Sequence, residues 1–249
     1  MIKKISLLTL LIFFGLIFSW SWAGTCPSPE EVLTSLKKLF SRARTLRVEE
    51  IRPAPVEGFC EVVVVPAPGA KKLFYLDEKG RYAFFGQLYD FKKGENLTQR
   101  RLAELNRLSP DQLKELDSLV AFQVGRGPKT LYLVTDPDCP FCRRLEATLD
   151  GLLKEGRITL KVILYPLTAL HPEAKKKCIS LICDHKGWSE LLAGYVSDHL
   201  CPEGQAKVEK AVKRLSSLGI RATPTLIFPD GRVFPGAKTR EQILDLLNS

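Results

Sequence analysis

A Cys-x-x-Cys motif between a strand pattern and a helix pattern constrains this chain more than any other feature. The motif is Cys139-Pro140-Phe141-Cys142. Residues 129–135, KTLYLVT, have the composition of a buried strand, and residues 139–155 have the pattern of a helix that Gly156 can end. Positions i and i+3 share one helix face, so two sulfurs there can form and break a bond with little backbone movement. The placement predicts a redox-active pair in a mixed α/β layer structure.

The start of a helix also favours thiolate chemistry. Unpaired N–H groups and the positive end of the helix dipole stabilise a thiolate, which is the nucleophile in disulfide exchange. Pro140 suits the first helical position, where no N–H is needed. We expect Cys139 to be the exposed attacking thiol and Cys142 the more buried resolving thiol. Phe141 adds no positive charge, and charges of both signs flank the motif: Asp136, Asp138, Arg143 and Arg144.

Two other interpretations of the motif are compatible with its residues. Half of a zinc site would need a second pair of ligands, because structural zinc takes four. A purely structural disulfide is the other alternative. The position between strand and helix favours redox activity over both.

The first residues have the pattern of a secretory signal peptide. Lys3 and Lys4 precede an apolar stretch, and Ser21-Trp22-Ala23 offers small residues for cleavage. An uncleaved membrane anchor is the alternative. We expect residues 1–23 to be removed and the protein to be exported to an oxidising compartment, which permits disulfides.

Composition narrows the class further. The 249 residues are 45% hydrophobic and 26% charged, as in ordinary globular proteins. The formal net charge of +9 permits nucleic acid or membrane binding. However, the only basic cluster, residues 175–177, reads as a solvated helix face, so we expect no nucleic-acid partner.

The seven cysteines are an odd number, so at least one thiol is free or pairs with another molecule.

The pattern along the chain divides it into four parts: a signal peptide (1–23), an N-terminal module (24–95), a helical linker (96–119) and a second domain (120–249). The module has a helix pattern at 29–42 and strand patterns at 60–65, 72–77 and 81–86. It is small for independent stability and can gain core by dimerising. The linker contains two helix patterns, and Ser109-Pro110 starts the second. The second domain reads, after the redox helix, as a strand (158–164), helices (173–183, 187–195, 203–218), a strand (225–228), a turn, a strand (232–234) and a helix (239–247).

Four segments of the sequence carry a family resemblance: Leu133-Val134-Thr135-Asp136 before Cys139-Pro140-Phe141-Cys142, Ala222-Thr223-Pro224-Thr225, residues 51–58 (IRPAPVEG) and residues 86–90 (GQLYD). In these segments the chain resembles the periplasmic disulfide isomerases of the DsbC/DsbG family. The match covers nearly the whole chain after residue 23. A proline followed by an aromatic in the motif is closer to DsbG than to DsbC, and Cys26 and Cys60 depart from the family pattern.

The resemblance implies an α+β fold: a thioredoxin-like catalytic domain with a helical insert, behind a small helix-plus-antiparallel-sheet dimerisation domain and a helical linker. It implies a V-shaped homodimer whose cleft holds misfolded or misoxidised exported proteins, and a membrane reductant of the DsbD type. Pro140, Phe141, Thr223 and Pro224 would form the active-site and substrate-binding surface, with a cis bond before Pro224. No cofactor and no metal are implied.

The remaining cysteines have different expectations. Cys183 and Cys201 match the family's structural disulfide. The alternative is a zinc site that adds His185 and His199. Cys26 and Cys60 can pair and staple the N-terminal module, a possibility that the sequence leaves open. Cys178 reads as an inert buried thiol on a helix.

Five functions are compatible with these features. The leading expectation is a thiol:disulfide isomerase or reductase that works through a Cys139 mixed disulfide. The alternatives are a DsbG-like reductant of sulfenylated cysteines, a dithiol oxidase, a holdase chaperone with incidental redox activity, and a Cu(I) metallochaperone. The copper function is disfavoured because Met1 is the only methionine.

Overall fold

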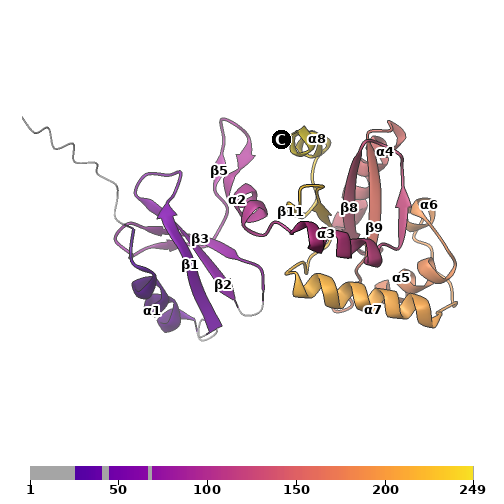
Figure 1. Ribbon diagram of the computed structural model, residues 1–249, viewed down its shortest axis with the longest axis horizontal. Helices are drawn as coiled ribbons and strands as arrows, with labels where there is room; N and C mark the ends of the chain where they lie inside the picture. The colour runs from indigo at the N-terminus through magenta and orange to yellow at the C-terminus, as the bar shows by residue number, and fades with distance from the viewer. Residues whose placement is uncertain (1–25, 41–44, 67–68, 249) are drawn as a thin grey trace, which may run out of the picture.

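The computed structural model describes residues 26–40, 45–66 and 69–248 (Figure 1). The expected signal peptide at 1–23 lies outside these residues. In the part of the chain that is described, none of the helices combines the length and the apolarity that crossing a bilayer requires.

The N-terminal module is a four-stranded antiparallel sheet with one helix on it (Figure 1). Its elements are α1 (Pro29–Leu39), β1 (Leu46–Pro53), β2 (Phe59–Pro66), β3 (Lys72–Asp77) and β4 (Ala83–Phe84), with the strands in the order β1-β2-β3-β4. A capping box between Ser28 and Glu31 starts α1. The helix buries Val32 and Leu36 on apolar side chains of β2 and β3. This small core is the module's main source of hydrophobic stabilisation.

Three elements between residues 46 and 96 differ from the expectations. The strand β1 was not predicted, because charged residues alternate along it and only a neighbouring strand reveals its pairing with β2. The strand pattern at 81–86 shortens to the two residues of β4. A short hairpin follows, made of β5 (Tyr89–Asp90) and β6 (Glu95–Asn96), which was also not predicted.

The expected linker contains two helices, α2 (Leu97–Leu105) and α3 (Pro110–Leu116), the latter continued by a 3₁₀ turn, Asp117–Leu119. The guanidinium of Arg101 on α2 pairs with Glu61 of β2 at 2.9 Å and with Glu50 of β1 at 2.6 Å. Ala103 of the same helix lies in a core cluster of the second domain, and so does Leu116 of α3. The helix α2 therefore contacts both parts of the chain.

The second domain is built on a five-stranded sheet with the order β11-β10-β8-β9-β7. The strands are β7 (Phe122–Val124), β8 (Lys129–Thr135), β9 (Ile158–Leu164), β10 (Thr225–Ile227) and β11 (Val233–Pro235); the helices are α4 (Pro140–Lys154), α5 (Ala174–Cys183), α6 (Trp188–Leu192), α7 (Pro202–Ser217) and α8 (Arg240–Asn248). Only β8 and β9 are parallel. The expected order of elements from residue 129 onward is confirmed, and β7 is an addition.

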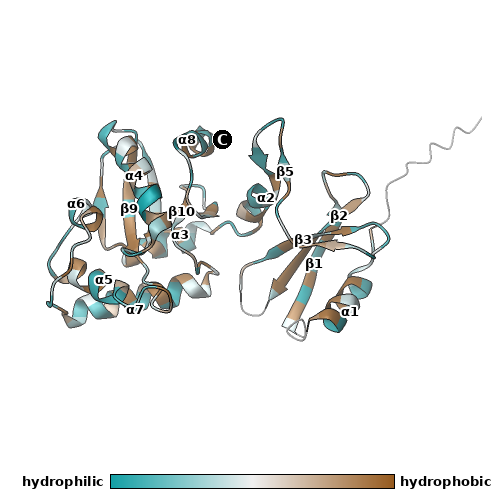
Figure 2. Ribbon diagram, turned by 180° about the vertical axis from the view of Figure 1, so that it is seen from behind, coloured by the Kyte–Doolittle hydropathy of each residue, from teal (hydrophilic) through white to brown (hydrophobic). Residues whose placement is uncertain are grey.

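The central strand β8 explains the continuous apolar run at 129–135. Leu131 and Leu133 lie in the core cluster that contains α4, whereas Tyr132 and Val134 lie in the cluster that contains α7. Both faces of the sheet are therefore covered, and the successive side chains from Leu131 to Thr135 of β8 are all buried. Figure 2 shows hydrophobic residues along β9 and along β2 of the first sheet. This double burial fixes the end of β8, from which the cysteine motif follows.

Candidate active site

Cys139 is the N-cap of α4, and Pro140 occupies the first turn. The loop from β8 is closed by the Cys139 N–H, which donates to Asp136 O at 3.1 Å. The Cys139 thiol donates to Thr223 O at 3.7 Å, from a segment 84 residues away in the chain. The structure thus brings together the predicted motif and the predicted Thr223-Pro224 segment.

The expectation that Cys139 is exposed is wrong for this structure. Cys139 is 3% exposed and Cys142 is 0% exposed. The order of the two is as expected, since Cys139 is the more accessible. Part of the cover over Cys139 comes from the Thr223 carbonyl, which the sequence pattern around the motif does not reveal.

Burial strongly disfavours the thiolate of Cys142. It raises the pKa of this thiol to about 12, against opposing effects of the Thr135 hydroxyl, the Asp136 backbone and the Thr223 side chain. The Thr223 hydroxyl is itself buried and has no hydrogen-bond partner among the described residues. Its effect on the pKa of Cys142 shows that it lies close to that sulfur.

The peptide bond between Thr223 and Pro224 is cis. The carbonyl of Pro224 accepts from the Gly236 N–H at 2.8 Å, and Thr225 starts β10 directly afterwards. The segment is therefore held by the sheet while it faces the cysteine pair.

The two aspartates beside the motif are not free charges. The carboxylate of Asp136 accepts from the Asp138 N–H at 2.8 Å and the Leu167 N–H at 2.7 Å, and it pairs with His171 Nδ1 at 2.9 Å. The carboxylate of Asp138 forms an ion pair with Lys177 of α5. These contacts hold the loop that carries Cys139 and partly neutralise it.

Lys177 corrects the interpretation of residues 175–177 as a solvated face. Its side chain is only 21% exposed. Lys175 and Lys176 do reach the surface, where they pair with Glu209 at 3.1 Å and Asp198 at 2.6 Å. One of the three lysines therefore belongs to the candidate site.

Phe141 presents an exposed aromatic surface beside the pair. Its ring is 56% exposed, and the guanidinium carbon of Arg144 lies 5.4 Å from the ring centroid. Arg143 turns back instead and donates from Nη2 to Pro137 O at 3.2 Å. Of the two arginines, Arg144 is the one that shares a surface with Phe141.

Glu146 is a site residue that the sequence pattern did not single out. It lies on α4 one turn after Cys142 and is 2% exposed. The Thr135 hydroxyl donates to Glu146 Oε1 at 2.6 Å. Burial raises the pKa of Glu146. A glutamate in an amphipathic helix ordinarily faces solvent, so only the tertiary structure identifies it.

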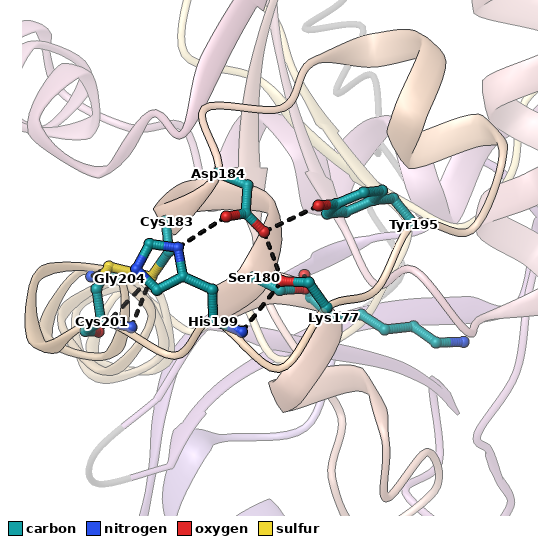
Figure 3. Close-up of a disulfide and its surroundings, with 9 residues drawn as sticks. Lys177, Ser180, Cys183, Asp184, Tyr195, His199, Cys201 and Gly204 are labelled. Carbon is teal, nitrogen blue, oxygen red and sulfur yellow. Dashed lines mark hydrogen bonds and ion pairs between the residues drawn. A yellow bond between two sulfur atoms is a disulfide. The ribbon is translucent and has the colours of Figure 1, made fainter.

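Cys183 and Cys201 form a disulfide that ties the end of α5 to the start of α7 (Figure 3). Both sulfurs are used in this bond, so neither is a zinc thiolate.

The carboxylate of Asp184, next to this disulfide, accepts hydrogen bonds from Ser197 Oγ at 2.5 Å and from Tyr195 Oη at 2.9 Å. It also pairs with His199 Nδ1 at 2.7 Å. Hydrogen bonds from Ser197 and then His199 lower the pKa of Asp184 to about 2.

Cys26 and Cys60 form a second disulfide, between the segment before α1 and the fully buried start of β2. Cys178 is 0% exposed and remains a free thiol. Burial raises its pKa, with smaller effects from Asp136 and Asp138. Among the described residues, no group of three His, Cys, Asp or Glu side chains is arranged to hold a metal ion.

The N-terminal module has a cavity and several exposed aromatic side chains on its surface. A cavity of about 880 Å³ lies between α1 and the β3–β4 edge, with Leu36, Phe74 and Phe85 in its wall. Large side chains that are at least half exposed also lie in this region: Tyr82, Phe84, Phe85, Tyr89 and Phe91. Such a surface is typical of an interaction site.

Two family models match the chain. The Disulfide bond isomerase protein N-terminal domain matches residues 23–99, and the Thioredoxin-like domain matches residues 119–249. Together they agree with the antiparallel sheet module and the mixed-sheet domain described above. The expected α+β fold is confirmed.

Curated relatives match over most of the chain. A probable thiol:disulfide interchange protein DsbC of Bordetella avium is 28% identical over 224 residues, 86% of this chain and 76% of that protein. The DsbC of Dickeya dadantii is 25% identical, with 82% of each chain covered. The thiol:disulfide interchange protein DsbG of Pseudomonas aeruginosa is 24% identical over 95% of this chain and 96% of its own.

Proposed function

Because this chain belongs to the DsbC/DsbG family of thiol:disulfide interchange proteins, we propose that it rearranges or reduces wrong disulfides in exported proteins. The observation that carries the proposal is the position of Cys139 at the start of α4. It lies beside Thr223 and is slightly more accessible than Cys142. This arrangement supports Cys139 as the attacking thiol and Cys142 as the resolving thiol.

The chemistry starts with the thiolate of Cys139. It attacks one sulfur of a substrate disulfide, forming a mixed disulfide and releasing the other substrate sulfur as a thiolate. If a second substrate thiolate then attacks the mixed disulfide, the substrate leaves with a rearranged bond and Cys139 is regenerated. No electrons are gained or lost overall in this branch.

The second branch reduces the substrate. The thiolate of Cys142 attacks Cys139 Sγ, the substrate sulfur leaves as a thiolate, and a Cys139–Cys142 disulfide forms. Two electrons have then passed to the substrate, so a reductant must return the pair to its dithiol form. A membrane reductant of the DsbD type is the proposed donor.

The proposed assembly is a homodimer through the N-terminal module. The strand β4 is an edge of its sheet, and Phe84 and Phe85 beside it are 51% and 56% exposed. Pairing of two such edges would bury these rings and enlarge a small core. The proposal also includes export to the periplasm. It divides the mature chain into a dimerisation domain (24–95), a helical linker (96–119) and a thioredoxin-like catalytic domain (120–249).

A second candidate function is reduction of sulfenylated cysteines, as a DsbG-like protein. The observation in its favour is Phe141, which follows Pro140 and offers an exposed ring with Arg144 over it. In this reaction Cys139 attacks a sulfenic acid, water is released, and Cys142 resolves the mixed disulfide.

The test is refolding of a scrambled multi-disulfide protein by the wild type and by Cys139→Ser, with the oligomeric state measured alongside. The proposal expects a dimer whose isomerisation is lost in Cys139→Ser. A dimer that rescues no disulfides but reduces a sulfenylated protein would favour the second candidate. If aggregation is suppressed equally by both proteins and neither redox activity appears, the protein is a holdase.

A further inference from the structure

Glu146 is a buried carboxyl group behind the cysteine pair, and the exchange chemistry above does not use it. It faces the same side of α4 as Cys142, four residues earlier, and both side chains are at most 2% exposed. A buried carboxyl is costly unless it is partnered, and its partner here is the Thr135 hydroxyl at 2.6 Å.

The Thr135 hydroxyl connects this carboxyl to the resolving thiol. The hydroxyl lies at the end of β8, and hydrogen bonding from it also favours the thiolate form of Cys142. A hydroxyl can accept one proton while it donates another. The three groups therefore form a continuous path: the thiol of Cys142, the hydroxyl of Thr135 and the carboxylate of Glu146.

We propose that Glu146 is a positioning residue for the resolving step, which receives the proton of the Cys142 thiol through the Thr135 hydroxyl. The proposal rests on the proposed function, because it concerns the step in which Cys142 displaces the substrate from Cys139. Glu146 touches neither sulfur of the mixed disulfide and acts only through Thr135.

The proton and electron balance of the step is complete. The thiol proton of Cys142 moves to Thr135 Oγ1 while the hydroxyl proton of Thr135 moves to Glu146 Oε1. The Cys142 thiolate then attacks Cys139 Sγ, and the substrate sulfur leaves with the electron pair of the broken S–S bond. The Glu146 proton returns to bulk water or to the departing thiolate.

The resolving thiol needs such an acceptor because it is almost never ionised alone. With a pKa of about 12, only about 1 in 10⁵ Cys142 thiols would be a thiolate at pH 7. Burial also raises the pKa of Glu146, which makes its carboxylate a stronger proton acceptor than an exposed one. The pKa values of Cys142 and Glu146 are thus closer to each other than those of a buried thiol and an ordinary surface carboxylate.

Other charges also act on this path. Arg143 on α4 favours the Glu146 carboxylate, and Asp136 on the loop after β8 opposes it. From α5, Cys178 faces the same buried region, and the charges of Asp136 and Cys142 act on its thiol. Asp136 is held by His171 and by backbone N–H groups, so it is not placed to take the proton in place of Glu146.

The experiment isolates the resolving step. Reduced full-length protein is mixed with excess glutathione disulfide, quenched with acid at intervals and analysed by mass, from pH 5.5 to 9. Formation of the Cys139–glutathione adduct reports attack, and its conversion to the Cys139–Cys142 disulfide reports resolution. The variants are Glu146→Gln, Thr135→Val and Thr135→Ser, with Glu203→Gln as the control, since Glu203 is an exposed glutamate at the start of α7.

The proposal expects Glu146→Gln to slow resolution at least about tenfold at pH 7, because general base catalysis typically contributes ~10²–10⁴-fold. The wild-type rate should level off with rising pH, whereas the variant rate should keep rising about tenfold per pH unit, as expected when hydroxide is the base. Thr135→Val should match this loss, and Thr135→Ser should retain most of the rate. Adduct formation should stay within about twofold of the wild type, because attack by Cys139 does not use Glu146.

Three results would overturn the proposal. One is a folded Glu146→Gln variant with wild-type resolution and an unchanged pH profile. If that variant does not fold, equal rates of resolution in Thr135→Val and Thr135→Ser would overturn the proposal instead. Failure of the wild type to form the adduct at all would remove the proposed function itself, and this step with it. A purely structural role for Glu146 would lower the unfolding temperature without changing the shape of the pH profile.

Discussion

The Cys26–Cys60 disulfide is expected to be the main covalent support of the N-terminal module. It closes a loop with a sequence separation of 34. In the chain-entropy model, a loop of that length stabilises the folded state by roughly 3.8 kcal/mol at 25 °C. A module of this size changes its unfolding temperature by roughly 4–8 °C per kcal/mol, so loss of the bond should lower it by roughly 15–30 °C.

The assay is thermal and denaturant unfolding of Cys26→Ala/Cys60→Ala and of the wild type, each with and without a thiol reductant. The control is Cys183→Ala/Cys201→Ala, which removes the disulfide of the other domain. Without reductant, the module variant should be less stable than the wild type by most of the contribution of the disulfide. With reductant the difference should fall to about 1 kcal/mol, the residual cost of removing a buried sulfur at Cys60. Equal stability of variant and wild type without reductant would refute the reasoning.

Three further predictions concern the second domain. Leu149→Ala removes a fully buried side chain of α4 and should cost about 2–5 kcal/mol of unfolding free energy, measured by denaturant titration. Asp184→Asn should lower the stability of the folded protein at pH 7. The pKa of Asp184 is lowered from 3.8 to about 2 in the folded state. The carboxylate therefore contributes fully to stability above pH 4, and this contribution is lost as the pH falls through 2. The stability difference between Asp184→Asn and the wild type should therefore shrink from pH 4 downward, and a constant difference would contradict it. Lys177→Gln leaves the charge of Asp138 unpaired beside Cys139 and should slow adduct formation about three- to fivefold, since partly exposed pairs are worth up to about 1 kcal/mol; Lys176→Gln is the control and should leave the rate unchanged.

The sequence predicted the elements whose patterns are locally complete. The run at 129–135 and the motif that follows it define β8, the first turn of α4 and the order of the two thiols. The pairing of Thr223-Pro224 with this site came from the family resemblance, and no local pattern contains it. The strand β1 was missed because its charged residues pair with β2 and α2, and those partners are distant in the sequence.

The burial of site residues was the least predictable property. An exposed Cys139 follows from its position at a helix N-terminus, but the carbonyl of Thr223 covers its sulfur from 84 residues away. Glu146 follows Cys142 by four residues and so lies on the same face of α4. No pattern in the sequence indicates that this face packs against the end of β8. Thr135 likewise appears as the last residue of a strand, and its contact with Glu146 needs both elements in place.

The charge beside Cys139 is a property of three segments that meet in the fold. Read alone, Asp136 and Asp138 place two negative charges next to a cysteine that must ionise, and such charges disfavour a thiolate. In the structure Asp136 accepts two N–H groups and contacts His171, and Asp138 pairs with Lys177 from α5. The loop before α5 and α5 itself therefore offset much of the local negative charge. It follows that substitutions in α5 should change the reactivity of Cys139 even though no residue of that helix belongs to the Cys-x-x-Cys motif.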